Sequence, residues 1–98
     1  MKKYRNIEIP KWEVDAIQWT GGNIEDLKDF FKDDKKYRFN GNTVNNIHGN
    51  CAIIKYDELS TMTVRPTAYI CRNTTGFIGN ILQMSEESFN LIFKEIVE

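Results

Sequence analysis

The stretch from Val14 to Asp26 (Val-Asp-Ala-Ile-Gln-Trp-Thr-Gly-Gly-Asn-Ile-Glu-Asp) constrains the fold of this 98-residue chain more than any other. Its first part is rich in the β-branched and aromatic residues that favour strands. Two glycines then break the pattern, and Asn23 can cap a helix whose first turn is acidic. Apolar residues continue at helical spacing, so the pattern predicts a helix over about 23–32. We expect the side-chain oxygen of Asn23 to accept from amides of the first turn.

The predicted strand over residues 12–20 changes its apolar phase in the middle. Trp12, Val14 and Ala16 share one face, whereas Ile17 and Trp19 fall on the other. Either the strand is buried on both faces, or a bulge near Ala16 turns Trp19 toward the core. We favour the bulge.

Turn signals organise the rest of the chain. Residues 1–11 are basic and contain Pro10, which suits an edge or a loop. Asn40-Gly41 is typical of a two-residue hairpin loop and would join strands near 37–39 and 42–44. Ser85, followed by an apolar stripe, predicts a C-terminal helix over about 85–96. Short loops between the remaining strands favour antiparallel pairing. The sequence therefore predicts an α+β fold, an antiparallel β meander with two helices.

Length and composition limit the classes of protein. A chain of 98 residues with 41% hydrophobic and 28% charged residues fits one globular domain, 1–98. The 13 basic and 14 acidic residues argue against binding nucleic acid through bulk charge and against an acidic mimic of nucleic acid. No apolar run has the length of a membrane span. We expect a cytosolic protein with no membrane contact.

The residues of common catalytic and metal sites are sparse. Cys51 and Cys71 cannot form a zinc site with the single histidine, His48, unless acidic residues or a second chain contribute. We expect two small, half-buried thiols on strands, with a disulfide as the alternative. No nucleophile elbow, Cys–His motif or phosphate-binding glycine loop is present. Neighbouring carboxylates such as Glu25 and Asp26 diverge on a helix and complement its dipole. The sequence predicts neither an enzyme nor a cofactor.

Aromatic residues and arginines are the best candidates for ligand contacts. Aromatic rings can stack on bases, and arginines on strands or turns can hold an anion or an acidic patch. Trp12, Trp19, Tyr37, Tyr69 and Phe77 are the candidate stacking residues. The candidate binding residues are Arg65, Arg72, Arg38, Tyr69, Asn80 and Trp19.

Two segments carry a family resemblance. The basic start Met1-Lys2-Lys3-Tyr4-Arg5 is followed by Val14-Asp15-Ala16-Ile17-Gln18-Trp19-Thr20-Gly21 and then by a helix. This order resembles the start of a family of small phage and prophage proteins with an A-(I/W)-Q-W-T-G stretch. The second half departs from the family, because Pro66-Thr67-Ala68 stands where a Pro-Gly-Asp turn is usual. The resemblance implies a phage setting and no particular chemistry.

A second likeness lies in the C-terminal half. Thr67-Ala68-Tyr69-Ile70-Cys71, then Gly76, Ile78-x-Asn80 and a terminal helix, are similar in spacing to phage counter-defence proteins that sequester nucleotide immune signals. We therefore expect a phage accessory protein in the host cytoplasm that binds a host or host-defence protein stoichiometrically, as an inhibitor or modulator. One alternative is an oligomeric sponge for a small anionic nucleotide. Another is a small single-stranded nucleic-acid binder, whose affinity would fall with salt.

Overall fold

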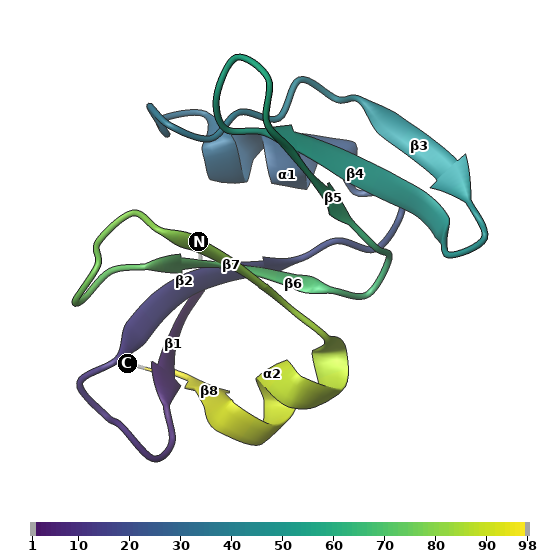
Figure 1. Ribbon diagram of the computed structural model, residues 1–98. Coiled ribbons are helices and arrows are strands. Elements are labelled where there is room, and N and C mark those ends of the chain that lie inside the picture. Colours follow the sequence, from purple (N-terminus) through teal and green to yellow (C-terminus); the bar gives the residue numbers. More distant parts are fainter. Residues whose placement is uncertain (1, 98) are drawn as a thin grey trace. The chain divides into compact units, whose positions relative to one another are not determined.

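The computed structural model describes residues 2–97, and these fall into two compact units. Unit 1 comprises Met1–Gln18 and Ala68–Glu98, and unit 2 is Trp19–Thr67. Unit 2 is thus inserted into the sequence of unit 1 (Figure 1). Within the described range the chain forms two helices and eight strands in antiparallel sheets. The predicted α+β class, with one helix in the first half and one near the C-terminus, is confirmed.

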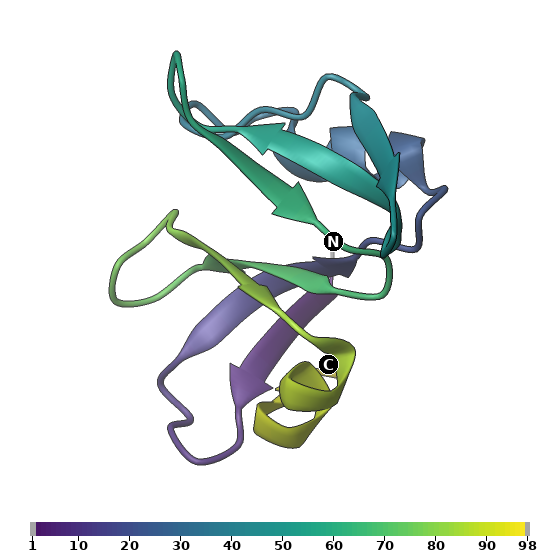
Figure 2. The same cartoon turned by 45° about the vertical axis from the view of Figure 1, so that its right-hand side comes forward.

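Unit 1 is a five-stranded antiparallel sheet in the order β7-β6-β2-β1-β8. Its central strand β2 pairs with β1 on one side and with β6 on the other. The only helix of this unit within residues 2–97, α2, packs against the sheet (Figure 2, yellow-green). The elements are β1 (Lys2–Asn6), β2 (Glu13–Gln18), β6 (Tyr69–Asn73), β7 (Ile81–Met84), α2 (Glu86–Ile92) and β8 (Phe93–Glu95).

An aromatic cluster joins α2 to this sheet. The ring of Phe89 stacks on Tyr69 at a centroid distance of 3.9 Å and meets Tyr4 edge-on at 4.8 Å. The ring of Phe93 lies 5.4 Å from Phe89. Such stacked and edge-on pairs add to the burial of apolar area. The buried residues of this core are Val14, Ala16, Cys71, Phe89 and Phe93.

Strand β2 is regular, and the predicted bulge is wrong. Its register with β6 runs without interruption from Val14 to Gln18. Ile17 faces Ile70 across the strands, on the face opposite the aromatic cluster, so β2 is apolar on both faces at its end. Trp19 lies beyond the end of the strand and belongs to unit 2. The change of apolar phase therefore has two causes: the central strand is apolar on both faces, and the chain passes from unit 1 to unit 2 directly after it.

The C-terminal helix begins where it was predicted and ends earlier. The side chain of Ser85 accepts a hydrogen bond from the N–H three residues on, which confirms the cap. The helix stops at Ile92, although the apolar stripe predicted it over about 85–96. The next residues, Phe93–Glu95, form β8 and pair with β1. Backbone hydrogen bonds to an open sheet edge replace the last helical turn.

Unit 2 is a three-stranded antiparallel meander in the order β3-β4-β5, together with one helix. The predicted meander is therefore found here, whereas β2 and β6 of unit 1 pair across the whole insertion. The elements are α1 (Ile24–Phe31), β3 (Thr43–Asn46), β4 (Gly49–Lys55) and β5 (Thr61–Val64). Buried side chains of this unit include Trp19, Leu27, Phe30, Phe31, Phe39, Ile54 and Val64.

The hairpin of unit 2 lies later in the chain than predicted. Arg38 forms a bridge with Lys55, and β3 begins at Thr43 on the same edge of β4. Both flanks of Asn40-Gly41 therefore run along β4 instead of pairing with each other, and these two residues loop out. The actual turn is at residues 47–48, between β3 and β4. The predicted Asn40-Gly41 hairpin is wrong.

Helix α1 confirms the first predicted helix but not its cap. Asn23 is the N-cap residue, yet its side chain makes no capping hydrogen bond. Its Oδ1 instead accepts from the backbone N–H of Thr20 at 2.8 Å and from the hydroxyl of Thr20 at 2.9 Å. The side chain of Asn23 thus orders the turn before the helix.

Candidate binding site

The structure divides the predicted binding residues between the two units. Arg38 and Arg65 are exposed residues of unit 2. Arg72, Tyr69 and Asn80 belong to unit 1. Neither unit by itself gathers the arginines around an aromatic surface.

Two of the predicted aromatic contacts are part of the protein core. Trp19 is fully buried, its Nε1–H donates to the carbonyl oxygen of Asn50 at 2.8 Å, and Phe39 meets its ring edge-on. Tyr69 is stacked against Phe89. Both rings therefore contribute to the packing of their own units.

Arg72 lies within a ladder of charges on β1, β2 and β6. It stands opposite Asp15 in the register of β2 and β6. The carboxylate of Asp15 also lies 3.2 Å from the ammonium of Lys3 on β1. Arg72 is therefore a cross-strand neighbour of Asp15 in this row of charged residues.

Arg38 lines a small hollow of about 260 Å³ in unit 2, together with two lysines. The ammonium of Lys28 is 3.8 Å and that of Lys32 is 2.9 Å from a carboxylate of helix α1. Asp34 adds another carboxylate to the lining. The cations of this hollow are thus largely offset by neighbouring acids.

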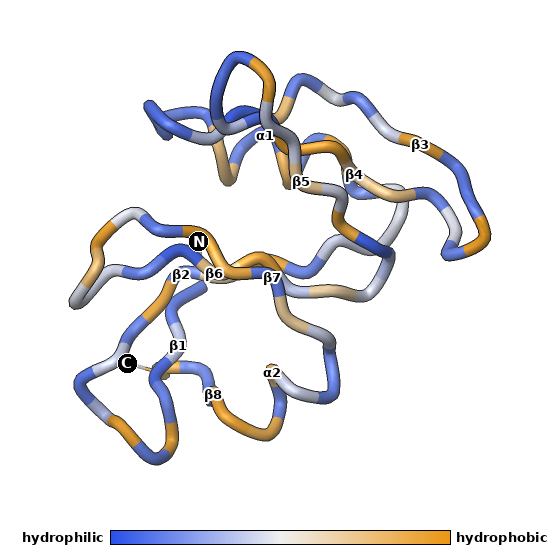
Figure 3. The backbone as a smooth tube through the Cα atoms, viewed as in Figure 1, coloured by the Kyte–Doolittle hydropathy of each residue, from blue (hydrophilic) through white to orange (hydrophobic). Residues whose placement is uncertain are grey.

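Unit 1 has an apolar groove with a volume of about 560 Å³. It lies between the β1–β2 loop and the β6–β7 loop, and apolar residues occur in both loops (Figure 3). Its apolar lining residues are Ile9, Trp12, Phe77 and Leu82, and its polar ones include Lys11 and Asn73.

The β1–β2 loop is held in place by one buried polar side chain. Asn6 is only 5% exposed, and its Oδ1 accepts from the N–H groups of Glu8 at 3.0 Å and Ile9 at 2.7 Å. The N–H of Trp12 closes the loop by donating to the carbonyl oxygen of Ile9 at 2.9 Å. Ile9 is therefore 56% exposed in an ordered turn.

The β6–β7 loop presents two apolar side chains in the same way. Phe77 and Ile78 stand between Gly76 and Gly79, whose φ angles are +65° and +87°. These left-handed conformations favour glycine. The N–H of Gly79 donates to the carbonyl oxygen of Asn73 at 2.8 Å. Phe77 and Ile78 remain 80% and 75% exposed.

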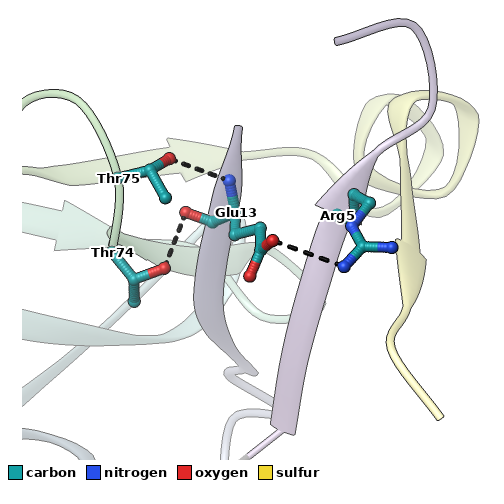
Figure 4. A network of polar contacts seen from close by, with 4 residues as sticks. All are labelled: Arg5, Glu13, Thr74 and Thr75. Carbon is teal, nitrogen blue, oxygen red and sulfur yellow. Dashed lines mark hydrogen bonds and ion pairs between the residues drawn. The ribbon is translucent and has the colours of Figure 1, made fainter. Parts of the chain in front are cut away.

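Hydrogen bonds between the loops and β2 fix the floor of the groove. The indole Nε1–H of Trp12 donates to Asn73 Oδ1 at 2.9 Å. Figure 4 shows the neighbouring network, in which Glu13 N–H donates to the hydroxyl of Thr75 and Glu13 O accepts from the hydroxyl of Thr74. The carboxylate of Glu13 pairs with Arg5 at 3.4 Å (Figure 4). Hydrogen bonds within the chain thus preform the groove.

Sequence reasoning identified only part of this groove. Trp12 and Phe77 were named as candidate stacking residues, but Ile9, Lys11 and Leu82 were missed. A usable signal was present: an apolar pair, Phe77-Ile78, stands inside a glycine turn, where polar residues are usual.

The cysteines and the single histidine differ in their exposure. Burial raises the pKa of the Cys71 thiol to about 12, so it stays protonated at neutral pH. Cys51 is also buried, and His48 is exposed in the β3–β4 turn. Among residues 2–97, no cluster of three or more His, Cys, Asp or Glu side chains could hold a metal ion.

Comparison with known proteins adds no relative: no family model, curated protein or solved structure matches this chain. Of the helices within residues 2–97, neither has the length and apolar character of a membrane span.

Proposed function

We propose that this protein acts by stoichiometric binding of a partner protein through the apolar groove of unit 1. The observation that carries the proposal is the exposure of Ile9 and Phe77, two apolar residues that line a preformed groove. Contiguous exposed apolar surface is characteristic of interaction sites. Covering a large aromatic such as Phe77 would contribute roughly 1.5–3 kcal/mol of hydrophobic free energy.

The two loops have a fixed conformation, and this favours tight binding. An interface pays entropy when it immobilises loops and side chains, and a preorganised site avoids much of that cost. Asn6 and Gly79 already hold the loops through hydrogen bonds within the chain. Little of the free energy gained from apolar contacts is therefore needed to order the loops.

Lys11 gives the groove a charge preference. It is exposed at the rim and forms no ion pair within residues 2–97. The matching partner segment would insert an apolar side chain between Ile9 and Phe77 and place a carboxylate beside Lys11. Such a rim charge would act more on the association rate and on specificity than on affinity.

The setting that we propose is a phage infection, in which the partner is a host or host-defence protein in the host cytoplasm. The support for this setting is the resemblance of residues 1–5 and 14–21 to small phage proteins. Binding without catalysis is favoured by the protonated thiol of Cys71 and by the apolar character of the groove. A protein of this kind would act as an inhibitor or a modulator.

The nucleotide sponge and the single-stranded nucleic-acid binder have less support. Both need cations beside open aromatic faces. Trp19 is buried, Tyr69 is stacked on Phe89, and Arg72 stands opposite the carboxylate residue Asp15 in the strand register. The groove itself is mostly apolar and carries one lysine.

Selection from a displayed library of random peptides tests the binding site without knowledge of the partner. The wild-type protein should enrich peptides that combine a large apolar residue with a nearby Asp or Glu. Binding of a selected peptide should move the indole N–H resonance of Trp12, at the groove floor, and leave that of buried Trp19 in place. Replacing Phe77 by Ala should weaken the peptide at least tenfold.

The matched control is Leu91→Ala, which removes another exposed apolar side chain of unit 1, one that does not line the groove. This variant should bind the peptide like the wild type. Equal peptide enrichment by the wild type and Phe77→Ala, or a selected peptide that binds both variants equally, would contradict the proposal.

A further inference from the structure

The β3–β4 hairpin of unit 2 lies in a segment without charge. From Phe39 to Ile54 the chain has no Lys, Arg, Asp or Glu, although 28% of all residues are charged. Val44, Asn45, Asn46, Ile47 and His48 are nevertheless exposed. Protein surfaces that face water are usually rich in charge, whereas the cores of interfaces are depleted of it. The hairpin therefore has the composition of a surface that becomes covered.

Strand β3 is also an edge of its sheet and has β4 as its only strand neighbour within the described residues. The N–H of Ile53 donates to the carbonyl oxygen of Asn42 at 3.0 Å, so these two residues stand at a hydrogen-bonded position of the ladder. Because such positions alternate along an antiparallel ladder, Val44 bonds to β4 while the N–H and C=O of Thr43 and Asn45 point outward. Natural edges usually carry a proline, a charge or a bulge against further pairing, and Thr43–Asn46 has no charge or proline and pairs in regular register.

We propose that β3 is a dimerisation edge that pairs antiparallel with β3 of a second copy of this chain. A two-fold axis at Val44 sets Thr43 of each copy opposite Asn45 of the other. Their outward N–H and C=O groups are then in register as hydrogen-bonded pairs on both sides of the axis. The two Val44 side chains, each 39% exposed, meet at the axis as a close pair. The edge is self-complementary, as a two-fold interface requires.

The edge strand β8 of unit 1 is not suited to the same kind of pairing. The same symmetry about the middle residue of β8 would place Lys94 against its own copy. Like charges directly opposite each other destabilise a strand pair. Strand β3 has no such obstacle. This inference is independent of the groove, which lies in the other unit.

Light scattering after size exclusion tests the dimer with a charge at the axis. The wild type should approach the mass of two chains as its concentration rises. Val44→Lys should remain a monomer, because two ammonium groups would meet at the axis. Leu59→Lys is the matched control, since Leu59 is also an exposed apolar residue of unit 2 but lies in the β4–β5 loop. It should dimerise like the wild type.

A backbone variant tests the hydrogen bonds of the edge. Asn45→Pro removes an N–H that the chain does not use toward β4, so the unit should fold while the dimer weakens at least tenfold. Asn45→Ala keeps the N–H and should dimerise normally. Circular dichroism of both variants establishes that the fold is retained.

Cross-linking tests the register. At the proposed axis the Cα atoms of Val44 and its copy would lie about 4.5 Å apart, a separation that a disulfide can span. Val44→Cys should therefore form a covalent dimer under mild oxidation. Ile47→Cys should not, although Ile47 is 96% exposed, because its copy would lie about 20 Å away along the strands. A wild type that stays monomeric at every concentration, a dimer that persists in Val44→Lys, or equal cross-linking of both cysteine variants would overturn the proposal.

Discussion

The two units expose apolar residues in different ways. Unit 1 holds them in two loops beyond the ends of its strands, where Asn6 and two glycines fix the turns. Unit 2 exposes them on the edge and turn of a hairpin, where Val44 is part of the strand itself. A loop groove accepts a side chain of a partner, whereas a strand edge accepts backbone. We propose two interfaces of different kinds, one in each unit.

Charge separates the units further. Cross-strand ion pairs join β1 and β2 in unit 1, such as Lys3–Asp15 and Arg5–Glu13. The hairpin of unit 2 has no charged residue between Phe39 and Ile54. Exposed ion pairs contribute little to stability, but they keep a sheet surface soluble and set its register. The uncharged surface of the hairpin is therefore better evidence for an interface than the ion pairs of unit 1 are.

The two tryptophans give the largest expected difference between the units. Trp19→Ala removes a fully buried indole of unit 2 and leaves the carbonyl oxygen of Asn50 without this donor. It should lower the free energy of unfolding by about 3–5 kcal/mol. Trp12→Ala in unit 1 should cost clearly less, because Trp12 is only partly buried. Urea unfolding followed by circular dichroism measures both, and equal losses would contradict this view of the units.

The aromatic cluster of unit 1 should respond with an intermediate loss. Phe89→Leu keeps an apolar side chain under the sheet but removes the ring that contacts Tyr4, Tyr69 and Phe93. Each aromatic pair contributes about 0.5–1.5 kcal/mol beyond area, so the free energy of unfolding should fall by about 2 kcal/mol. The same urea titration applies. A loss smaller than the roughly 1 kcal/mol expected for removal of a helix cap, as in Ser85→Ala, would show that the ring geometry is unimportant here.

Each unit contains one buried cysteine, and Cys71 should make stability depend on alkaline pH. Burial raises the pKa of the Cys71 thiol from its ordinary value of 9.0 to about 12. Below pH 9 both states are protonated and the full stability is present. Between pH 9 and 12 only the unfolded state loses the proton, so the free energy of unfolding should fall by about 1.4 kcal/mol per pH unit. Unfolding at pH 8 and 10 measures the change.

The control for this pH effect is Cys71→Ala, which should lose that part of the dependence. A slope in Cys71→Ala as steep as in the wild type would assign the effect to other groups. Alkylation of the native protein, located by mass spectrometry, adds a comparison of the units. Modification of Cys71 reports the opening of unit 1, and modification of Cys51 reports that of unit 2.

The helix caps give the smallest effect. Ser85→Ala should cost about 1 kcal/mol in the free energy of unfolding, because the Ser85 side chain accepts from the N–H of Ser88 at 3.1 Å. Hydrogen exchange at the amide of Ser88 should become faster. Asn23→Ala should leave the exchange of the first turn of α1 unchanged, since Asn23 bonds to Thr20 instead. Faster exchange in α1 would contradict the observed geometry.

Local signals predicted the elements well where neighbours in the sequence decide the structure. The helix after Asn23 and the cap at Ser85 follow from capping and apolar spacing. Strand choices that depend on distant partners were not predictable in this way. β8 exists because β1 offers it an edge, and the flanks of Asn40-Gly41 pair with β4 and not with each other.

The candidate site was harder to predict for the same reason. Phe77 and Trp12 stood out as aromatic residues, but their proximity arises from the pairing of β2 with β6 across the whole of unit 2. Asn6 gave no signal of its own, since its role is to hold a loop through a buried side-chain oxygen. Residue type identified individual members of the groove, and only the topology assembles them.

The insertion of unit 2 also bears on the order of folding. Pairing Val14 with Asn73 closes a loop that contains all of Trp19–Thr67, and the entropy of closing a chain grows with the length of the loop. The ends of unit 2 meet when the N–H of Thr67 donates to the carbonyl oxygen of Trp19 at 2.6 Å. If unit 2 folds first, its two ends are already close together, and the loop that remains to be closed is much shorter. Synthesis from the N-terminus favours this order, because unit 2 is complete before β6 leaves the ribosome.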